Sequence, residues 1–151
     1  MAVNFVPVDR DTPDWFPATV QEYLPEQHLA RFVVEIVEQL DLSRLVAAYA
    51  GTGSKPYHPA MLVALIFYGY ATGVFSSRKL AQATHDSIAF RFICANTHPD
   101  HRTIADFRKR FLDELEALFT EILLIAQAMG LVKLGTVSLD GTKIKANASK
   151  H

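Results

Sequence analysis

The last acidic residue of the chain, Asp140, has the surroundings of a metal-binding carboxylate. It follows a short apolar segment with strand composition, precedes Gly141, and is followed soon after by Lys143 and Lys145. A carboxylate at a strand end beside cationic side chains could hold a divalent metal ion against phosphate oxygens. Asp-Gly is also the commonest signal of a tight hairpin turn. On the residues alone, the turn explains Asp140 more simply than a metal site does.

Basic side chains in the middle of the chain could bind a polyanion. These residues are Arg78, Lys79, Arg102, Arg108, Lys109 and Arg110. Their contacts with phosphates would give an affinity for DNA that depends on salt. Four of them fall in or just before the first half of a helix predicted over 103–129, where positive charge opposes the helix dipole, and this favours an external partner. Ion pairs along a solvated helix, Lys109 with Asp113 or Arg110 with Glu114, explain the same charges equally well.

Cys94, His98 and His101 are spaced like ligands of a metal ion. A structural zinc site needs four ligands, and the only fourth candidate nearby is Asp100. Pro99 makes the segment a predicted turn, and the neighbours of Cys94 are apolar. We therefore expect Cys94 to be a small core residue and this segment to hold no metal.

The elements that must position these groups are mostly helices. Apolar residues recur at steps of three and four over Glu26–Leu40 and over 103–129, which is typical of helices with one buried stripe. Thr103 with Asp106 predicts the start of the second of these helices, as a variant of the capping box. A short helix is also predicted over Ser43–Tyr49.

An apolar helix is predicted between these two, over about residues 59–70. His58-Pro59 opens it and Gly73 ends it. Ser76 or Ser77, and then Ser87, can cap two further short helices. Three short helices between residues 76 and 115, joined by tight turns, have the layout of a helix-turn-helix unit.

Composition and length favour one globular domain. The chain has 151 residues, of which 50% are hydrophobic and 21% charged, and this excludes intrinsic disorder. One cysteine excludes an internal disulfide and fits a reducing compartment. The densest apolar stretch, about 60–71, is too short to span a bilayer, and we expect no membrane partner.

The net charge of −1 hides alternating blocks. Residues 1–50 carry −5, residues 51–110 carry +5, residues 111–132 carry −4 and residues 133–151 carry +3. If the fold has a surface that binds a polyanion, it should come from the second and fourth blocks. Chance alternation of charge on a solvated domain explains the blocks as well.

The predicted fold is mainly α and has three parts. They are an irregular N-terminal arm over 1–24, a multi-helix domain with a helix-turn-helix-like unit over 25–132, and a β-hairpin over 133–151. A lone two-stranded hairpin is marginally stable in water. We therefore expect the hairpin to begin a second domain that this sequence lacks.

Several segments together resemble the N-terminal domain of bacterial insertion-sequence transposases, over about residues 20–151. In order, they are YHPAML at 57–62, GVFSSRKL at 73–80, FRF at 90–92 and PDHRTIADFR at 99–108. The tail, SLDGTKIKANAS at 138–149, is similar to the segment around the first catalytic aspartate of that family. Several motifs in the right order are more specific than any one of them.

The resemblance implies a transposase with a ribonuclease-H-like domain and an Asp-Asp-Glu triad that binds Mg²⁺ or Mn²⁺. Asp140 matches the first aspartate, so the resemblance makes it catalytic and metal-binding in the intact enzyme. The other two carboxylates would lie beyond His151, and one aspartate cannot hold two metal ions. We therefore expect this chain alone to bind no metal and to be inactive in DNA cleavage and joining.

The resemblance also implies a partner and a location. The partner is double-stranded DNA at the terminal inverted repeats of a transposon, with a second copy of the chain as a further candidate. The implied location is the bacterial cytoplasm, at the nucleoid. We predict DNA contacts by the six basic residues above together with Lys143 and Lys145.

Two other functions are compatible with the residues. In the first, the Leu29–Leu40 helix and the Phe111–Met129 stripe form a subunit interface without direct DNA contact, and the chain inhibits transposition by pairing with the full-length protein. In the second, the chain is a free-standing helix-turn-helix regulator. The second leaves the terminal hairpin unexplained.

Overall fold

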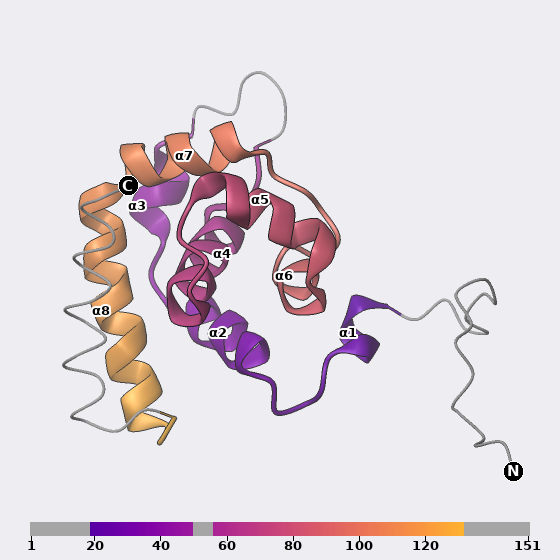
Figure 1. The fold of residues 1–151 in the computed structure, drawn as a ribbon. Coiled ribbons are helices and arrows are strands. Elements are labelled where there is room, and N and C mark those ends of the chain that lie inside the picture. The colour runs from indigo at the N-terminus through magenta and orange to yellow at the C-terminus, as the bar shows by residue number, and fades with distance from the viewer. Residues whose placement is uncertain (1–18, 50–55, 132–151) are drawn as a thin grey trace, which may run out of the picture.

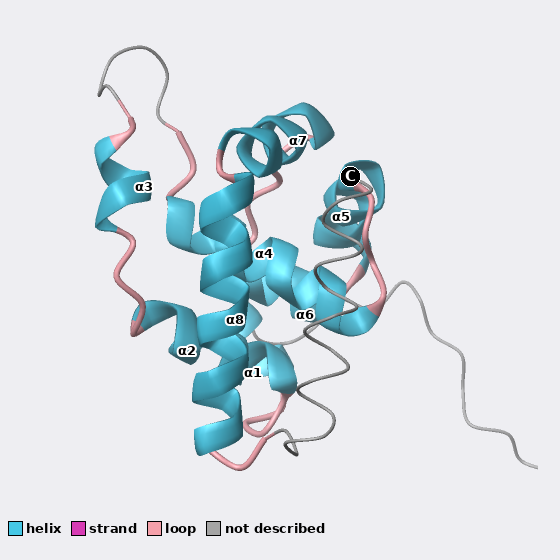
Figure 2. Ribbon diagram, turned by 90° about the vertical axis from the view of Figure 1, so that its left-hand side faces the viewer, coloured by secondary structure: helices cyan, strands magenta, loops and turns pink. Residues whose placement is uncertain are grey.

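The structure is a computed structural model that describes residues 19–49 and 56–131. Within these ranges the chain forms eight helices and no strand, which confirms the mainly α class there (Figures 1 and 2). The helices are α1 (Val20–Tyr23), α2 (Leu29–Glu38), α3 (Ser43–Ala47), α4 (Pro59–Thr72), α5 (Ser77–Asp86), α6 (Ile88–Ile93), α7 (His101–Arg110) and α8 (Leu112–Ala128). The predicted hairpin over 133–151 lies outside the described residues.

Helix α4 is the centre of the core. Its side chains are apolar all round, and every residue from Leu62 to Tyr70 is buried. Phe67 packs edge-on against Phe119 of α8, with ring centroids 5.3 Å apart, and Tyr68 packs in the same way against Phe90 of α6, at 5.0 Å. A helix that is hydrophobic on all sides needs neighbours on all sides, and α2, α5, α6 and α8 supply them.

The ends of α4 are those predicted from sequence. The Nδ1 atom of His58 accepts a hydrogen bond from the Ala60 amide at 3.0 Å, and Pro59 occupies the first turn, where its missing N–H costs nothing. Gly73 ends the helix with φ of 86°, a left-handed conformation that favours glycine. The chain then bends by 95° into α5.

A close backbone approach fixes that bend. A Cβ atom at Gly69 would lie 2.5 Å from the carbonyl oxygen of Val74 and 2.6 Å from Cδ2 of Leu80. The Val74 amide donates to the Gly69 carbonyl at 2.7 Å, and Leu80 of α5 is fully buried. The hydroxyl of Ser76 accepts from the Lys79 amide and caps α5. Only glycine lets the turn and α5 come this close to α4.

The N-terminal helices are held by one arginine. Its Nη2 donates to the carbonyls of Gln21 and Leu24, and its Nε donates to the Pro25 carbonyl at 2.9 Å. This residue, Arg31 of α2, also lies 5.0 Å above the Phe92 ring of α6. Helix α2 is shorter than the helix predicted over Glu26–Leu40. Helix α1 forms within residues 1–24, where an irregular arm was predicted.

The predicted long helix over 103–129 is two helices, which is a correction to the sequence analysis. The break falls at Phe111, with φ of −116° and ψ of 30°. The first helix begins at His101 because Asp100, not Thr103, is the N-cap, and its Oδ1 accepts from the Thr103 amide at 2.8 Å. The break lets the apolar stripes of both helices reach one core.

The faces assigned to a subunit interface are used inside the chain. On α8, the buried residues are Leu115, Leu118, Phe119, Ile122, Leu123 and Ala126. On α2 they are Ala30, Val33, Ile36 and Val37. In Figure 2, α8 runs along the front of α4, consistent with the Phe67–Phe119 contact. These stripes are therefore core faces.

No single helix within residues 19–49 and 56–131 is both long and apolar enough to cross a membrane. Only α4 and α5 taken together reach that length and apolarity, and the chain bends by 95° between them.

Replacing Gly69 by alanine is expected to destabilise the fold. Glycine to alanine inside a helix ordinarily adds about 1 kcal/mol of stability. Here the added methyl group meets a backbone carbonyl, so we expect a loss of about 1–3 kcal/mol. The free energy of unfolding, measured by urea titration, checks this. A gain of stability would mean that the close approach of α5 to α4 does not exist.

Replacing Asp100 by asparagine is expected to remove part of the acid sensitivity. The hydrogen bond from the Thr103 amide holds the pKa of the Asp100 carboxyl below its ordinary value. Its stabilising contribution is thus complete above about pH 4, the unfolded pKa, and is lost as pH falls through the lower folded pKa. Asparagine caps the helix without titrating. As pH falls from 5 to 2, the free energy of unfolding should decrease more for the unmodified protein than for the variant. Urea unfolding at each pH measures this difference. A difference that does not change with pH would contradict the assignment of Asp100 as the N-cap.

Candidate nucleic-acid interface

Four basic side chains on α5 and α7 are exposed and unpaired. They are Arg78, Lys79, Arg102 and Lys109. None of them forms an ion pair with a carboxylate of the described residues. Helices α5 and α7 pack against each other, so the four charges belong to one part of the fold.

The ion pairs that could explain these charges along one helix are absent from the described part of the chain. Lys109 does not pair with Asp113, and Arg110 does not pair with Glu114. The i,i+4 contact requires an unbroken helix, and the chain breaks between these residues at Phe111. The alternative that explained these cations by pairing on one helix is therefore wrong.

The break also corrects the dipole argument. Arg108, Lys109 and Arg110 occupy the last turn of α7, and Asp113 and Glu114 occupy the first turn of α8. Cations near a helix C-terminus and anions near an N-terminus are both favourable. The helix end thus explains the placement of these three basic residues, whereas Arg102, the second residue of α7, still opposes the dipole.

The structure places Arg108 inside the protein, where it cannot meet a phosphate. Its side chain is 3% exposed, and its guanidinium lies 5.6 Å from the centroid of the Tyr70 ring. Nε, Nη2 and the Tyr70 hydroxyl are buried without a hydrogen-bond partner among the described residues. Burial lowers the pKa of the Arg108 guanidinium. We therefore leave Arg108 out of the candidate interface.

Arg110 is exposed, but its guanidinium already has partners. Nη2 donates to the carbonyl of Ala48, 62 positions earlier in the chain. The guanidinium also lies over the rings of Tyr49, at 5.2 Å, and Phe111, at 5.0 Å. Arg110 therefore ties the end of α7 to the segment after α3.

The exposed face of α5 holds a residue that the sequence analysis did not single out. Gln82 lies one turn after Arg78 and Lys79, and its amide nitrogen donates to Oδ2 of Asp86 at 2.9 Å. The opposite face is closed by the buried residues Leu80 and Thr84. The i,i+3 and i,i+4 spacing from two basic residues is the signal that could have identified Gln82.

The segment from Cys94 to His101 serves structure. Cys94 is buried, and burial raises the pKa of its thiol to about 12. His98 stacks on His85, with ring centroids 3.9 Å apart, and its Nδ1 lies 3.2 Å from the Thr84 hydroxyl. Across the described ranges, no group of three or more His, Cys, Asp or Glu side chains could hold a metal ion.

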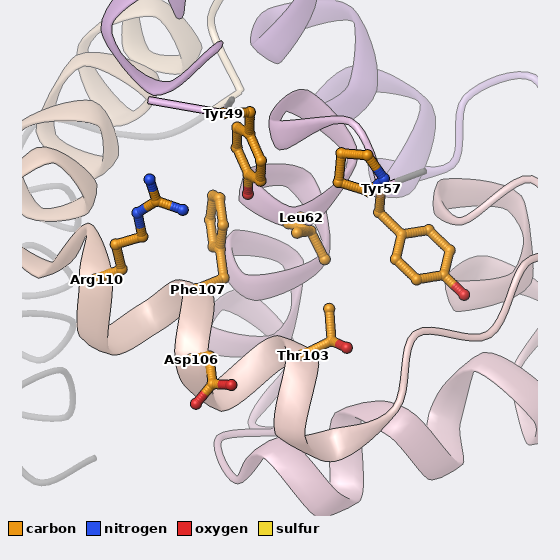
Figure 3. A pocket seen from close by; sticks show the side chains of 8 residues that line it. Tyr49, Tyr57, Leu62, Thr103, Asp106, Phe107 and Arg110 are labelled. Carbon is orange, nitrogen blue, oxygen red and sulfur yellow. The ribbon is translucent and has the colours of Figure 1, made fainter. Parts of the chain in front are cut away.

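A pocket of about 380 Å³ opens beside α7 (Figure 3). It is lined by Tyr49, Pro56, Tyr57, Leu62, Thr103, Asp106, Phe107 and Arg110. Asp106 is the one carboxylate in this lining. Asp140, Lys143 and Lys145, the other predicted site residues, lie outside the described residues.

Replacing Arg108 by methionine is expected to leave the fold as stable or more stable. Two buried nitrogen atoms of the guanidinium group lack a hydrogen-bond partner among the described residues. An apolar side chain of similar length removes the cost of burying them, with a gain of up to about 3 kcal/mol. Arg110→Met should instead destabilise, because it removes the bond to the Ala48 carbonyl. Urea unfolding measures both. A loss of about 3 kcal/mol or more for Arg108→Met would show that the guanidinium has a partner.

Comparison with known proteins places this arrangement in a family. The family model of the transposase domain DUF772 matches residues 18–110, which is more than half of the chain and runs from α1 to the end of α7. No curated protein and no solved structure matches the chain. The matched region contains all four exposed, unpaired cations. The chain therefore belongs to the DUF772 family of transposase domains.

Proposed function

We propose that this domain binds the double-stranded DNA of transposon ends, at the terminal inverted repeats, during transposition. One observation carries the proposal. In a transposase-family domain, the exposed cations Arg78, Lys79, Arg102 and Lys109 have no carboxylate partner among the described residues. The location that goes with this role is the bacterial nucleoid.

Unpaired cations are the groups that bind phosphates best. A lysine or arginine in an ion pair must give up that pair before it binds DNA, whereas these four side chains have no carboxylate partner to give up among the described residues. Each phosphate that is neutralised releases a counterion and adds about −0.9 to the slope of log K against log salt. Four contacts predict a slope of about −3 to −4 from these residues.

The chemistry of strand cleavage and joining belongs to the intact transposase in this proposal. Asp140 would be one of several carboxylates that hold Mg²⁺ or Mn²⁺ there, as the Asp-Asp-Glu pattern requires. A two-metal site activates water and stabilises the leaving oxygen. The described residues would position the DNA end, and residues beyond them would carry the reaction.

The proposal predicts that two substitutions on α7 weaken DNA binding. Arg102→Ala with Lys109→Ala should lower the affinity for a 30-base-pair duplex that carries one terminal inverted repeat. The loss should be similar for unrelated duplexes, and the salt slope should become shallower by about 2. Fluorescence anisotropy between 50 and 300 mM salt measures both quantities.

The neighbouring arginine provides a matched control for charge. Arg108→Met removes one positive charge next to Lys109, but from a buried site, and it should leave the affinity almost unchanged. If the double variant binds as tightly as the unmodified chain, or if Arg108→Met weakens binding as much as the double variant does, the proposed surface is wrong.

A further inference from the structure

We infer that α4 and α5 form a helix-turn-helix unit whose second helix, α5, enters the major groove and reads base edges with Arg78 and Gln82. This inference rests on the proposed function, because it specifies how the domain would recognise duplex DNA. It also moves the helix-turn-helix unit from residues 76–115, where the sequence analysis expected it, to residues 59–86.

The angle and the turn between α4 and α5 have the required geometry. The helices meet at 95°, and four residues, 73–76, connect them. Helix-turn-helix pairs cross at about 90–120° through turns of three or four residues that often contain glycine. Gly73 supplies that glycine here, with φ of 86°. Figure 1 shows α5 crossing the end of α4.

The pair is held as one rigid unit. Gly69 admits the Val74 carbonyl and the Leu80 side chain against α4, and Leu80 has no exposed surface. A reading helix must keep a fixed orientation to the rest of the domain, and this contact supplies it.

The alternative reading helix, α7, lacks such a turn. Seven residues, 94–100, separate α6 from α7, which is longer than the three or four residues of the motif. In this scheme α7 contributes phosphate contacts at its two exposed cationic positions, Arg102 and Lys109.

One face of α5 is open over its first two turns. Arg78, Lys79 and Gln82 are exposed there, while His85 in the last turn stacks on His98. Ten residues give a helix of about 15 Å, which suits a major groove about 12 Å wide. Contacts from the N-terminal part of the second helix are typical of this motif.

The side chains on this face match the donor and acceptor pattern of bases. An arginine can donate two hydrogen bonds to O6 and N7 of guanine, and a glutamine can pair with N6 and N7 of adenine. Gln82 uses one N–H on Asp86. Its other N–H and its carbonyl oxygen remain for adenine, and the bond to Asp86 fixes the plane of the amide. Lys79 supplies a further positive charge for guanine or phosphate.

The test is a selection from a duplex pool with 20 randomised base pairs, using the full 151-residue chain. Four variants are compared with the unmodified chain: Arg78→Ala and Gln82→Ala on α5, and the controls Arg44→Ala and Gln39→Ala. The control side chains match the test residues in charge and type. Both are exposed, Arg44 on α3 and Gln39 at the C-cap of α2. Circular dichroism checks that each variant keeps its helices.

The inference predicts a distinct change for each α5 variant. Gln82→Ala should lose about 10-fold of the preference for an A·T pair at one position of the selected site, and Arg78→Ala should lose a similar factor for a G·C pair. Both control variants should select the same site as the unmodified chain. N7-methylation of the guanine that Arg78 reads should block binding by the unmodified chain.

Each other outcome has a definite meaning. If the chain binds duplexes but both α5 variants select the same site as the unmodified chain, the reading role of α5 is wrong and the proposed DNA binding stands. If N7-methylation has no effect, the major groove is not the site of contact. If the unmodified chain binds no duplex at 50 mM salt, both the inference and the proposed function are overturned.

Discussion

The contact of Gly69 with the turn before α5 is the constraint on which the candidate interface depends. The absence of a side chain at this one position lets the Val74 carbonyl and Leu80 lie against α4. The bend of 95° then directs α5 across the end of the most buried helix of the domain. Leu80 packs against α4 and Thr84 is buried beside His98, so the opposite, polar face of α5, with Arg78 and Gln82, is left in solvent. The missing side chain at Gly69 thus determines the orientation of α5, whose exposed face we propose binds DNA.

The ends of the helices could be predicted from sequence because local chemistry determines them. Ser76, Ser87 and Gly73 act where the residue types indicated. The break at Phe111 could not be predicted from periodicity, because the apolar spacing continues through it and neither glycine nor proline marks it. The charges did indicate the break. Three basic residues are favourable at the end of one helix, and the two acidic residues that follow are favourable at the start of the next.

The helices that carry the candidate site could be predicted from sequence, but the individual residues that are exposed there could not. The sequence identified the basic block on α5 and α7, but it could not separate Lys109, which is exposed, from Arg108, which is 3% exposed. Tertiary packing causes this difference in exposure, because Arg108 of α7 faces Tyr70 of α4. Gln82 was missed because an uncharged side chain gives no electrostatic signal. The spacing places Gln82 one turn after Arg78 and Lys79, and the structure adds that this face of α5 is exposed.

Amide chemical shifts of the isotope-labelled chain, followed during titration with an inverted-repeat duplex, test the central claim most directly. The account predicts shift changes over the first two turns of α5 and around Arg102 and Lys109 of α7, while the buried interior of α8 stays unchanged. Changes confined to α2 or α8, or a spectrum that the duplex leaves unaltered, would contradict the claim that the unpaired cations of α5 and α7 carry the contact with DNA.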